Sequence, residues 1–113
     1  MARVANKIEL LRAASEAAVR YVDRERDSRV APGADARLPP ELDHDFLRDP
    51  WQADRVLQLL AEAGDAGTVR STGGRYFGFV TGGVEPVALA ASTLAGAWDQ
   101  NAALPVMSPL AAK

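Results

Sequence analysis

Clusters of helix-breaking residues constrain the fold of this chain more than any other feature of its sequence. The first cluster, VAPGADARLPP, spans residues 30–40, and the second spans residues 68–83, where five of the nine glycines stand. Proline removes a backbone donor and glycine has low helix propensity, so both clusters interrupt helices. Because periodic apolar segments lie on either side of them, the sequence predicts a mainly α fold: three helices joined by loops, with little or no strand.

The first predicted helix covers residues 3 to about 27. One set of side chains recurs at intervals of four and three and therefore lies on one face: Val4, Ile8, Leu11, Ser15, Ala18 and Val22. Two explanations of this stripe remain open. It packs on the helix's own domain, or it forms a seam with a helix of a partner.

The second predicted helix opens at Asp49 and Pro50, an N-cap residue followed by a proline at the first helical position. Gly64 is expected to end this helix as a left-handed cap, with a turn over residues 65–67. Its apolar face is predicted to consist of Ala53, Val56, Leu57, Leu60 and Ala63.

The third predicted helix runs from Val84 to about Asn101, with Pro86 tolerated in its first turn. Its apolar face is predicted to hold Val84, Val87, Ala88, Ala91, Leu94, Ala95 and Trp98. Many of its residues are alanine or glycine, so a neighbouring element can approach closely. This helix is therefore suited to burial in a larger body.

The composition limits the classes of protein to which the chain can belong. Hydrophobic residues make up 48% of it, but 22 of them are alanine, so large core side chains are few. A net charge of −2 argues against nucleic-acid and anionic-membrane partners. The N-terminus lacks a signal-peptide pattern, and no apolar stretch is long enough to span a bilayer. We therefore expect a soluble cytoplasmic protein.

Metal sites are not predicted. The chain has no cysteine, and His44 is its single histidine, flanked by acidic residues that lie on other faces. We expect His44 to be a solvated loop residue rather than a ligand.

The glycine-rich region at 68–83 encloses a short aromatic run, RYFGFV. It lacks the lysine of a Walker phosphate loop and does not match the dinucleotide-binding fingerprint. Gly82 and Gly83 precede a helix, where they could hold an anion or form only a turn. Both interpretations remain open.

Four motifs carry a family resemblance: RYFGFVTGG, the later Pro86, AWDQNAAL and MSP. Together they resemble the N-terminal segment of the pyridoxal-phosphate-dependent group II amino-acid decarboxylases, which include the aromatic-L-amino-acid and glutamate decarboxylases. Weaker similarity extends through GTVRSTG, the second helix and the VAP after the first. The resemblance covers nearly all of this chain but only about the first quarter of a family member. Gly74 departs from the pattern, because many relatives have proline there.

The resemblance implies a type I pyridoxal-phosphate transferase-like α/β fold and the loss of CO2 from an amino-acid substrate. In that fold, residues 1–83 would be an N-terminal helical flap, and residues 84–113 would be the truncated start of the large cofactor-binding domain. The N-terminal helices would form a homodimer. Thr81 aligns with a substrate-contacting residue, while Phe79 and Val80 would supply apolar wall.

Some aromatic residues of the loop have a simpler interpretation. We expect Tyr76 and Phe77 to be core side chains rather than substrate contacts. For Phe79 the core interpretation also remains open.

The chemistry of this family needs a lysine that forms a Schiff base with the cofactor. Lys7 lies among charges on the first helix and Lys113 is the last residue, so neither is expected in a cofactor pocket. We therefore expect no catalytic or cofactor-binding residue here, no pyridoxal phosphate on this chain alone, and no activity from it alone. The alternative function is a non-catalytic helical dimerisation or interaction module.

Overall fold

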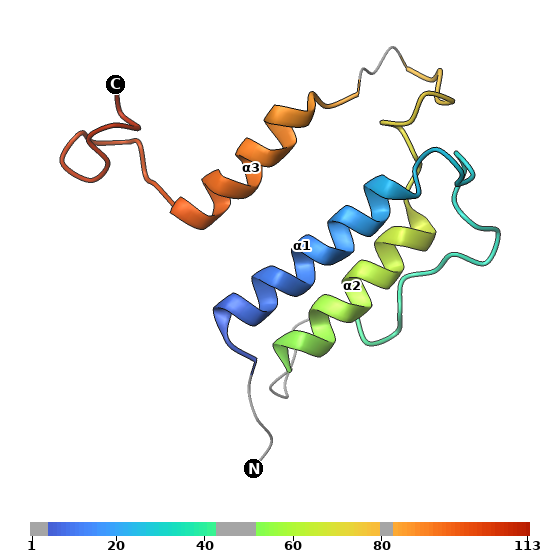
Figure 1. Ribbon diagram of the computed structural model, residues 1–113. Helices are drawn as coiled ribbons and strands as arrows, with labels where there is room; N and C mark the ends of the chain where they lie inside the picture. Colours follow the sequence, from blue (N-terminus) through green and yellow to red (C-terminus); the bar gives the residue numbers. More distant parts are fainter. Residues whose placement is uncertain (1–4, 43–51, 80–82) are drawn as a thin grey trace. The chain divides into compact units, whose positions relative to one another are not determined.

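The computed structural model describes residues 5–42, 52–79 and 83–113 (Figure 1). Three helices make up its regular structure: α1 (Lys7–Asp23), α2 (Ala53–Gly67) and α3 (Pro86–Trp98). No strand occurs in these three ranges, which confirms the mainly α prediction. None of the helices has both the length and the apolar character needed to cross a membrane.

The chain divides into two compact units, residues 1–81 and residues 82–113. Each unit is described by itself below.

A capping box sets the start of α1. The side-chain oxygen of Asn6 accepts a hydrogen bond of 3.0 Å from the Glu9 backbone N–H, and the Asn6 backbone N–H donates one of 3.0 Å to the Glu9 carboxylate. These reciprocal bonds satisfy donors that the first helical turn would otherwise leave unpaired. The helix is shorter than the predicted range of 3 to 27, because it ends at Asp23 and residues 24–28 form turns.

The face of α1 that is half-buried is not the predicted stripe. Its inner residues are Leu10, Ala14, Ala17 and Tyr21. The stripe lies on an adjoining face and is open: Ile8 is 63% exposed, and Leu11 and Val22 are also exposed. Val4 lies outside the described residues. Helix α1 does pack on its own domain, against α2, but of the described stripe residues only Ser15 is half-buried. The role of the exposed stripe residues as a seam with a partner stays a prediction.

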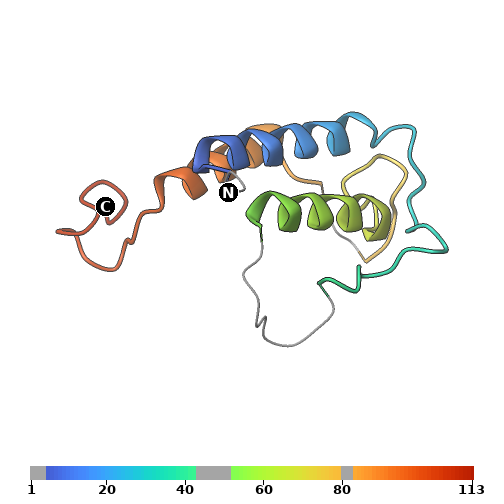
Figure 2. The ribbon, with the colours of Figure 1, turned by 90° about the horizontal axis from the view of Figure 1, so that it is seen from below.

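Helices α1 and α2 lie side by side and run in the same direction (Figures 1 and 2). Their C-terminal ends meet, where the Tyr21 hydroxyl lies 2.8 Å from that of Thr68. Consecutive helices can be parallel only if the connection returns the chain along the length of one of them. For the 15 residues of α2 this distance is about 22 Å.

The predicted linker at 30–40 makes that return by lying along α2. Gly33 donates its backbone N–H to the Ala66 carbonyl (3.1 Å) near the end of α2. Glu41 lies 3.8 Å from Arg55 near the beginning of α2. The segment therefore runs along α2 in the direction opposite to that of the helix.

Helix α2 differs from its prediction at both ends. It begins at Ala53, and the predicted capping pair Asp49–Pro50 lies outside the described residues, as does His44. Gly64 is not a cap: the helix continues to Gly67, and the backbone N–H and hydroxyl of Thr68 both donate to the Gly64 carbonyl (3.1 and 2.6 Å). The expected turn over 65–67 is therefore helical.

The predicted apolar face of α2 is confirmed in part, because Val56, Leu57 and Ala63 are half-buried whereas Ala53 is exposed. Leu59 is 5% exposed and is the one buried hydrophobic residue of the described chain, whereas the predicted face residue Leu60 is 58% exposed. The reason is that α2 is covered both by α1 and by residues 30–42. The most buried position of α2 is therefore Leu59, and not a residue of the face that packing against one helix alone would bury.

The second unit consists of α3 and a series of turns. Helix α3 begins at Pro86, two residues after the predicted Val84, with Glu85 as its N-cap and proline at the start of its first turn, where it is tolerated. It ends at Trp98, three residues before the predicted Asn101, because Asp99 adopts a left-handed conformation (φ 48°). The turns beyond it enclose the Ser108 side chain, which is 2% exposed.

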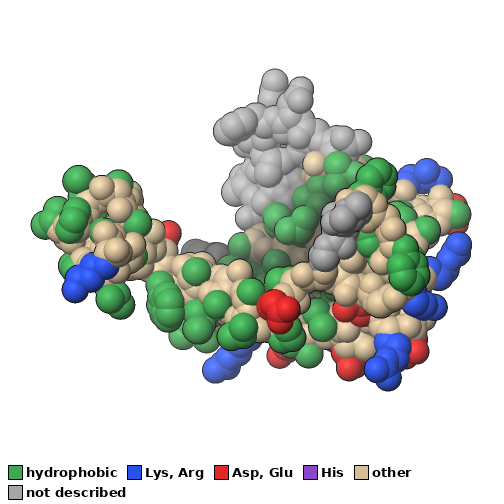
Figure 3. All heavy atoms as spheres, turned by 90° about the horizontal axis from the view of Figure 1, so that it is seen from above, with side chains coloured by type: hydrophobic (Ala, Val, Ile, Leu, Met, Phe, Trp, Pro, Cys, Tyr) green, Lys and Arg blue, Asp and Glu red, His purple; other side chains and the backbone are tan. Residues whose placement is uncertain are grey.

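The predicted apolar face of α3 is open to solvent. Every residue of the helix is exposed, including Val87 at 76%. The space-filling view, coloured by side-chain type, shows hydrophobic side chains lying open on the surface of the chain (Figure 3).

Candidate functional site

The loop that follows α2 contains all three residues predicted to contact substrate. Thr81 and Val80 lie outside the described residues, so only Phe79 is placed. Phe79 is 92% exposed and has a positive φ of 55°. A bulky residue adopts this conformation rarely, because its Cβ crowds the backbone there.

The other aromatic residues of the loop do not form a core. Phe77 is 92% exposed, so the expectation that it packs in the interior is wrong, whereas Tyr76 is half-buried. The predicted burial of Phe77 rested on its apolar composition. In the structure, the loop leaves this side chain open to solvent.

The loop has an anchored part and an exposed part. Residues 70–76, which we call the stem, are tied to the C-terminal end of α1 and the turns after it. The Thr72 hydroxyl donates to the Glu25 carboxylate, and the Arg75 guanidinium donates to the Ser28 carbonyl. Residues 77–79, which we call the tip, carry the two exposed phenylalanines.

Gly73 allows the stem to approach the turn after α1 closely. A Cβ at this position would lie 3.2 Å from Cγ of Glu25, which is tighter than ordinary contact. At neighbouring Gly74 a Cβ would meet nothing within 4 Å. The departure from the family pattern at Gly74 therefore leaves open space, whereas Gly73 has a steric reason to be glycine.

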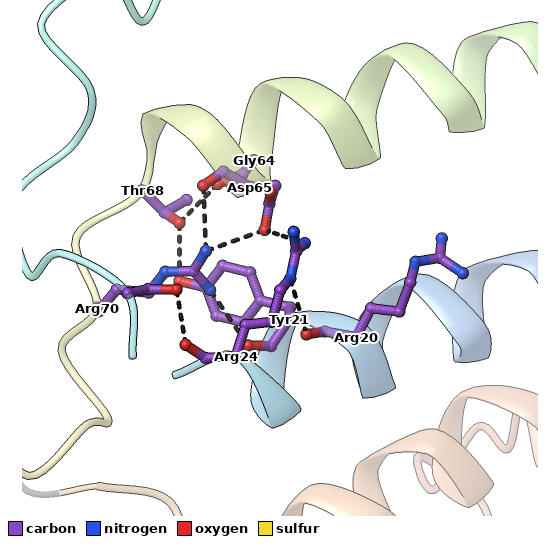
Figure 4. A network of polar contacts seen from close by, with 8 residues as sticks. Arg20, Tyr21, Arg24, Gly64, Asp65, Thr68 and Arg70 are labelled. Atoms are coloured by element: carbon purple, nitrogen blue, oxygen red, sulfur yellow. Dashed lines mark hydrogen bonds and ion pairs between the residues drawn. The ribbon is translucent and has the colours of Figure 1, made fainter. Parts of the chain in front are cut away.

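Arg70 lies at the base of the stem and is almost fully buried (Figure 4). Its Nη2 donates to the Asp65 carboxylate (2.9 Å) and to the Asp65 carbonyl (3.3 Å), and its Nη1 donates to the Tyr21 carbonyl (3.3 Å). The guanidinium carbon also lies 3.6 Å from the centre of the Tyr21 ring. One side chain therefore joins α1, α2 and the loop.

Asp65 and Thr68 complete this polar cluster. The Asp65 carboxylate accepts a second charge-assisted bond of 2.9 Å, from Nη2 of Arg24. The Thr68 hydroxyl donates its hydrogen to the Gly64 carbonyl, which can only accept. It follows that the Tyr21 hydroxyl is the donor in the 2.8 Å bond to Thr68.

The cluster is satisfied internally. No buried side-chain nitrogen or oxygen of the described residues lacks a hydrogen-bond partner. Arg70 therefore has little capacity to bind a ligand directly, because its buried groups are already engaged.

A shallow groove of about 320 Å³ lies between α1 and α2. Its floor is apolar and its rim is polar, lined by Ala13, Ala17, Arg20, Asp54, Leu57, Gln58, Ala61 and Glu62. The described residues contain no group of three or more potential metal ligands, in the groove or elsewhere.

The lysines of the chain do not fit the needs of pyridoxal phosphate. Lys7 is exposed in the first turn of α1, and Lys113 is exposed in the last turn of the chain. A lysine that condenses with this cofactor is normally enclosed, so that its amine is desolvated and made nucleophilic. Neither lysine is enclosed in this way in the structure.

Sequence reasoning missed the cluster of Tyr21, Asp65 and Arg70. One signal was present: Arg70 is a charged residue in the otherwise uncharged run GTVRSTGG. Its acceptor Asp65 lies only five residues before it, but Tyr21 precedes it by 49 residues and is brought near only by the fold.

Comparison of the chain with models of protein families, with curated proteins and with solved structures gives no match. The resemblance to the group II decarboxylases therefore stands on the sequence motifs RYFGFVTGG, AWDQNAAL and MSP alone.

Proposed function

We propose that this chain is the N-terminal part of a pyridoxal-phosphate-dependent amino-acid decarboxylase, a cytoplasmic carboxy-lyase. The resemblance of the motifs suggests it, and the state of α3 is the observation that supports it most. The sequence of α3, PVALAASTLAGAW, has no charged residue, and all of it is exposed. A helix that is apolar on every side normally lies inside a larger protein.

The polar side chains of α3 are also suited to burial. The Ser92 hydroxyl donates to the Ala88 carbonyl (3.0 Å), and the Thr93 hydroxyl donates to the Leu89 carbonyl (3.4 Å). A buried hydroxyl without a partner would cost about 1–3 kcal/mol. Since both donors are already paired within the helix, α3 can be enclosed without that cost.

In this proposal the tip of the loop forms part of the substrate site. The Thr81 hydroxyl donates to the substrate carboxylate, while Phe79 and Val80 exclude water from it. The positive φ of Phe79 supports a functional tip, because such strained residues concentrate at ligand-binding positions. Pyridoxal phosphate supplies the electron sink for the reaction, and its lysine and phosphate contacts come from residues other than these.

The exposed stripe on α1 supports a homodimer through the N-terminal helices. Ile8, Leu11 and Val22 are exposed although the adjoining face of α1 is packed. A second apolar face on an otherwise charged helix is typical of a helix with two partners.

Complementation tests the proposal. The chain would be co-expressed with a family decarboxylase that lacks its own N-terminal quarter, and CO2 release would be measured from an amino acid that the parent enzyme uses. We expect activity only when both pieces are present. Thr81→Val should lower kcat/KM by about tenfold to hundredfold, the effect of one lost charge-assisted hydrogen bond. Thr81→Ser keeps the hydroxyl and should therefore keep kcat/KM near that of the wild type. Absence of activity from the combined pieces would contradict the proposal, as would saturable binding of pyridoxal phosphate by the chain alone.

A non-catalytic helical dimerisation module is the alternative, and the same exposed stripe favours it. Sedimentation of the purified chain separates the two functions. A discrete, well-folded dimer that Leu11→Glu dissociates would favour the module. Leu60→Glu is the matched control, because Leu60 is equally apolar and exposed but lies on α2. Aggregation of the chain alone would favour the decarboxylase segment.

A further inference from the structure

The stem holds the tip in place through contacts that are concentrated on Arg70. Besides its three side-chain bonds, Arg70 donates its backbone N–H to the Val30 carbonyl (2.9 Å) and accepts from the Gly73 N–H (3.4 Å). The residue is thus bonded to α1, to the segment after α1, to α2 and to the stem itself. Any displacement of Arg70 moves the point from which the loop departs.

We infer that Arg70 is a positioning residue, which sets the placement of the Phe77–Phe79 tip through the stem without contacting the ligand. The inference rests on the proposed function only in the identity of that ligand, an amino-acid substrate. Direct binding is disfavoured, because the Arg70 side chain is 7% exposed and is bonded to Asp65 and Tyr21.

The geometry requires arginine rather than any cation. The guanidinium is planar, so it can lie on the Tyr21 ring while its edge donates to the Tyr21 carbonyl and to Asp65. A lysine ammonium keeps the charge but cannot form this stacked fork. Arg70→Lys therefore loses the stacked fork that ties the base of the stem to α1, while it keeps a charge that can pair with Asp65 and leaves the bonds of Thr72 and Arg75 in place.

Arg24 provides a matched control. It donates to the same Asp65 oxygen at the same distance of 2.9 Å, but its side chain is 56% exposed and it makes no bond to the stem. Arg24→Lys and Arg70→Lys therefore perturb the same carboxylate and differ in whether the loop is affected.

Amide hydrogen exchange on the full chain, read by NMR, tests the inference without any substrate. In Arg70→Lys we expect exchange of the Gly73 and Tyr76 amides to rise about tenfold, and the Phe77 and Phe79 amide signals to shift. The amides inside α2 should keep their exchange rates. In Arg24→Lys the stem amides should be unchanged. Equal stem exchange in the two variants would overturn the inference, and so would a uniform rise across α2, which would indicate a merely structural role.

A second pair of variants tests the stem without altering Arg70. Gly73→Ala introduces a Cβ 3.2 Å from the Glu25 side chain, whereas Gly74→Ala introduces one into open space. We expect the amide NMR signals of Phe77 and Phe79 to shift in Gly73→Ala and to remain unchanged in Gly74→Ala. The reverse result would overturn the role of the stem.

Kinetics of the complemented enzyme then separate this inference from the proposed function. If the wild-type chain restores CO2 release, Arg70→Lys should lower kcat/KM about tenfold and Arg24→Lys should not. If the wild-type chain restores nothing, the proposed function fails, while the exchange experiment still decides the role of Arg70. Restored activity that Arg70→Lys leaves intact would refute the positioning role alone.

Discussion

The two units of the chain bury their side chains to different degrees. In residues 5–79, two helices and a returning segment pack together, Leu59 of α2 is buried, and the side chain of the buried Arg70 is paired with Asp65 and Tyr21. In residues 83–113, α3 is apolar on all sides and every one of its residues is exposed. The first unit therefore has a small core and a polar cluster of its own. The surface of α3, in contrast, is of the apolar kind that is normally buried inside a protein.

The difference shows that apolar composition does not by itself stabilise a unit. Residues 83–113 are the more apolar part, but a helix gains stability from burial only where another element covers it. The first unit is rich in charge, and its contacts come from side chains far apart in the sequence.

The largest effect is expected when the two units are separated. This experiment tests whether the first unit folds by itself and the second does not. As isolated polypeptides, residues 1–81 should keep a cooperative thermal transition, while residues 82–113 should show little helix by far-UV circular dichroism. Helix α3 has 13 residues, and isolated helices shorter than about 12–15 residues are marginal in water. A fully helical 82–113 peptide would contradict the comparison.

Truncation of Leu59 tests whether the first unit depends on its small core. Leu59→Ala should lower the free energy of unfolding by about 2–5 kcal/mol, measured by urea denaturation, because it removes buried methyl groups and leaves a cavity. Leu60→Ala is the control: its side chain is 58% exposed, and the change should stay within about 0.5 kcal/mol. Equal losses would show that Leu59 is not the centre of the core.

Removal of the α1 cap should have a smaller effect on the same unit. Asn6→Ala removes the side-chain acceptor of the Glu9 N–H but keeps the backbone N–H that donates to the Glu9 carboxylate, and it should cost about 1 kcal/mol in thermal or urea unfolding. Gln52→Ala is the matched change at the start of α2, where the side chain makes no cap hydrogen bond. We expect that variant to unfold like the wild type, and a comparable loss there would contradict the assignment.

The number and type of the elements could be predicted from the sequence, because proline and glycine break helices by local physics. The packed side of α1 could not. Its inner face, which includes Leu10 and Tyr21, adjoins a stripe that carries more branched aliphatic side chains, Ile8, Leu11 and Val22. Periodicity identifies a face but not the element that covers it.

The same limit applies to the site. A glycine-rich aromatic loop was visible in the sequence, and the position of Phe79 at its exposed tip is compatible with the predicted role. The anchoring of that loop was not visible, because Arg70 bonds to residues of α1 and α2 that only the fold brings near. Parallel packing of the two helices, which the long connection permits, is what places Tyr21 beside Arg70.

The smallest expected effect is at the C-terminal end of α3. It tests whether a change in the second unit leaves the stability of the first unit unaltered. Asp99 adopts a left-handed conformation (φ 48°) and its N–H bonds to the Ala95 carbonyl (3.1 Å). Aspartate tolerates this region better than most residues do, but glycine adopts it without steric cost. Asp99→Gly should therefore stabilise the helix end by less than about 1 kcal/mol, seen as a modest gain in helix signal of the full chain, while Asp99→Ala should lose helix. Because the effect acts on backbone geometry alone, it should leave the urea midpoint of the first unit unchanged. A shift of that midpoint would mean that the two units do not unfold separately.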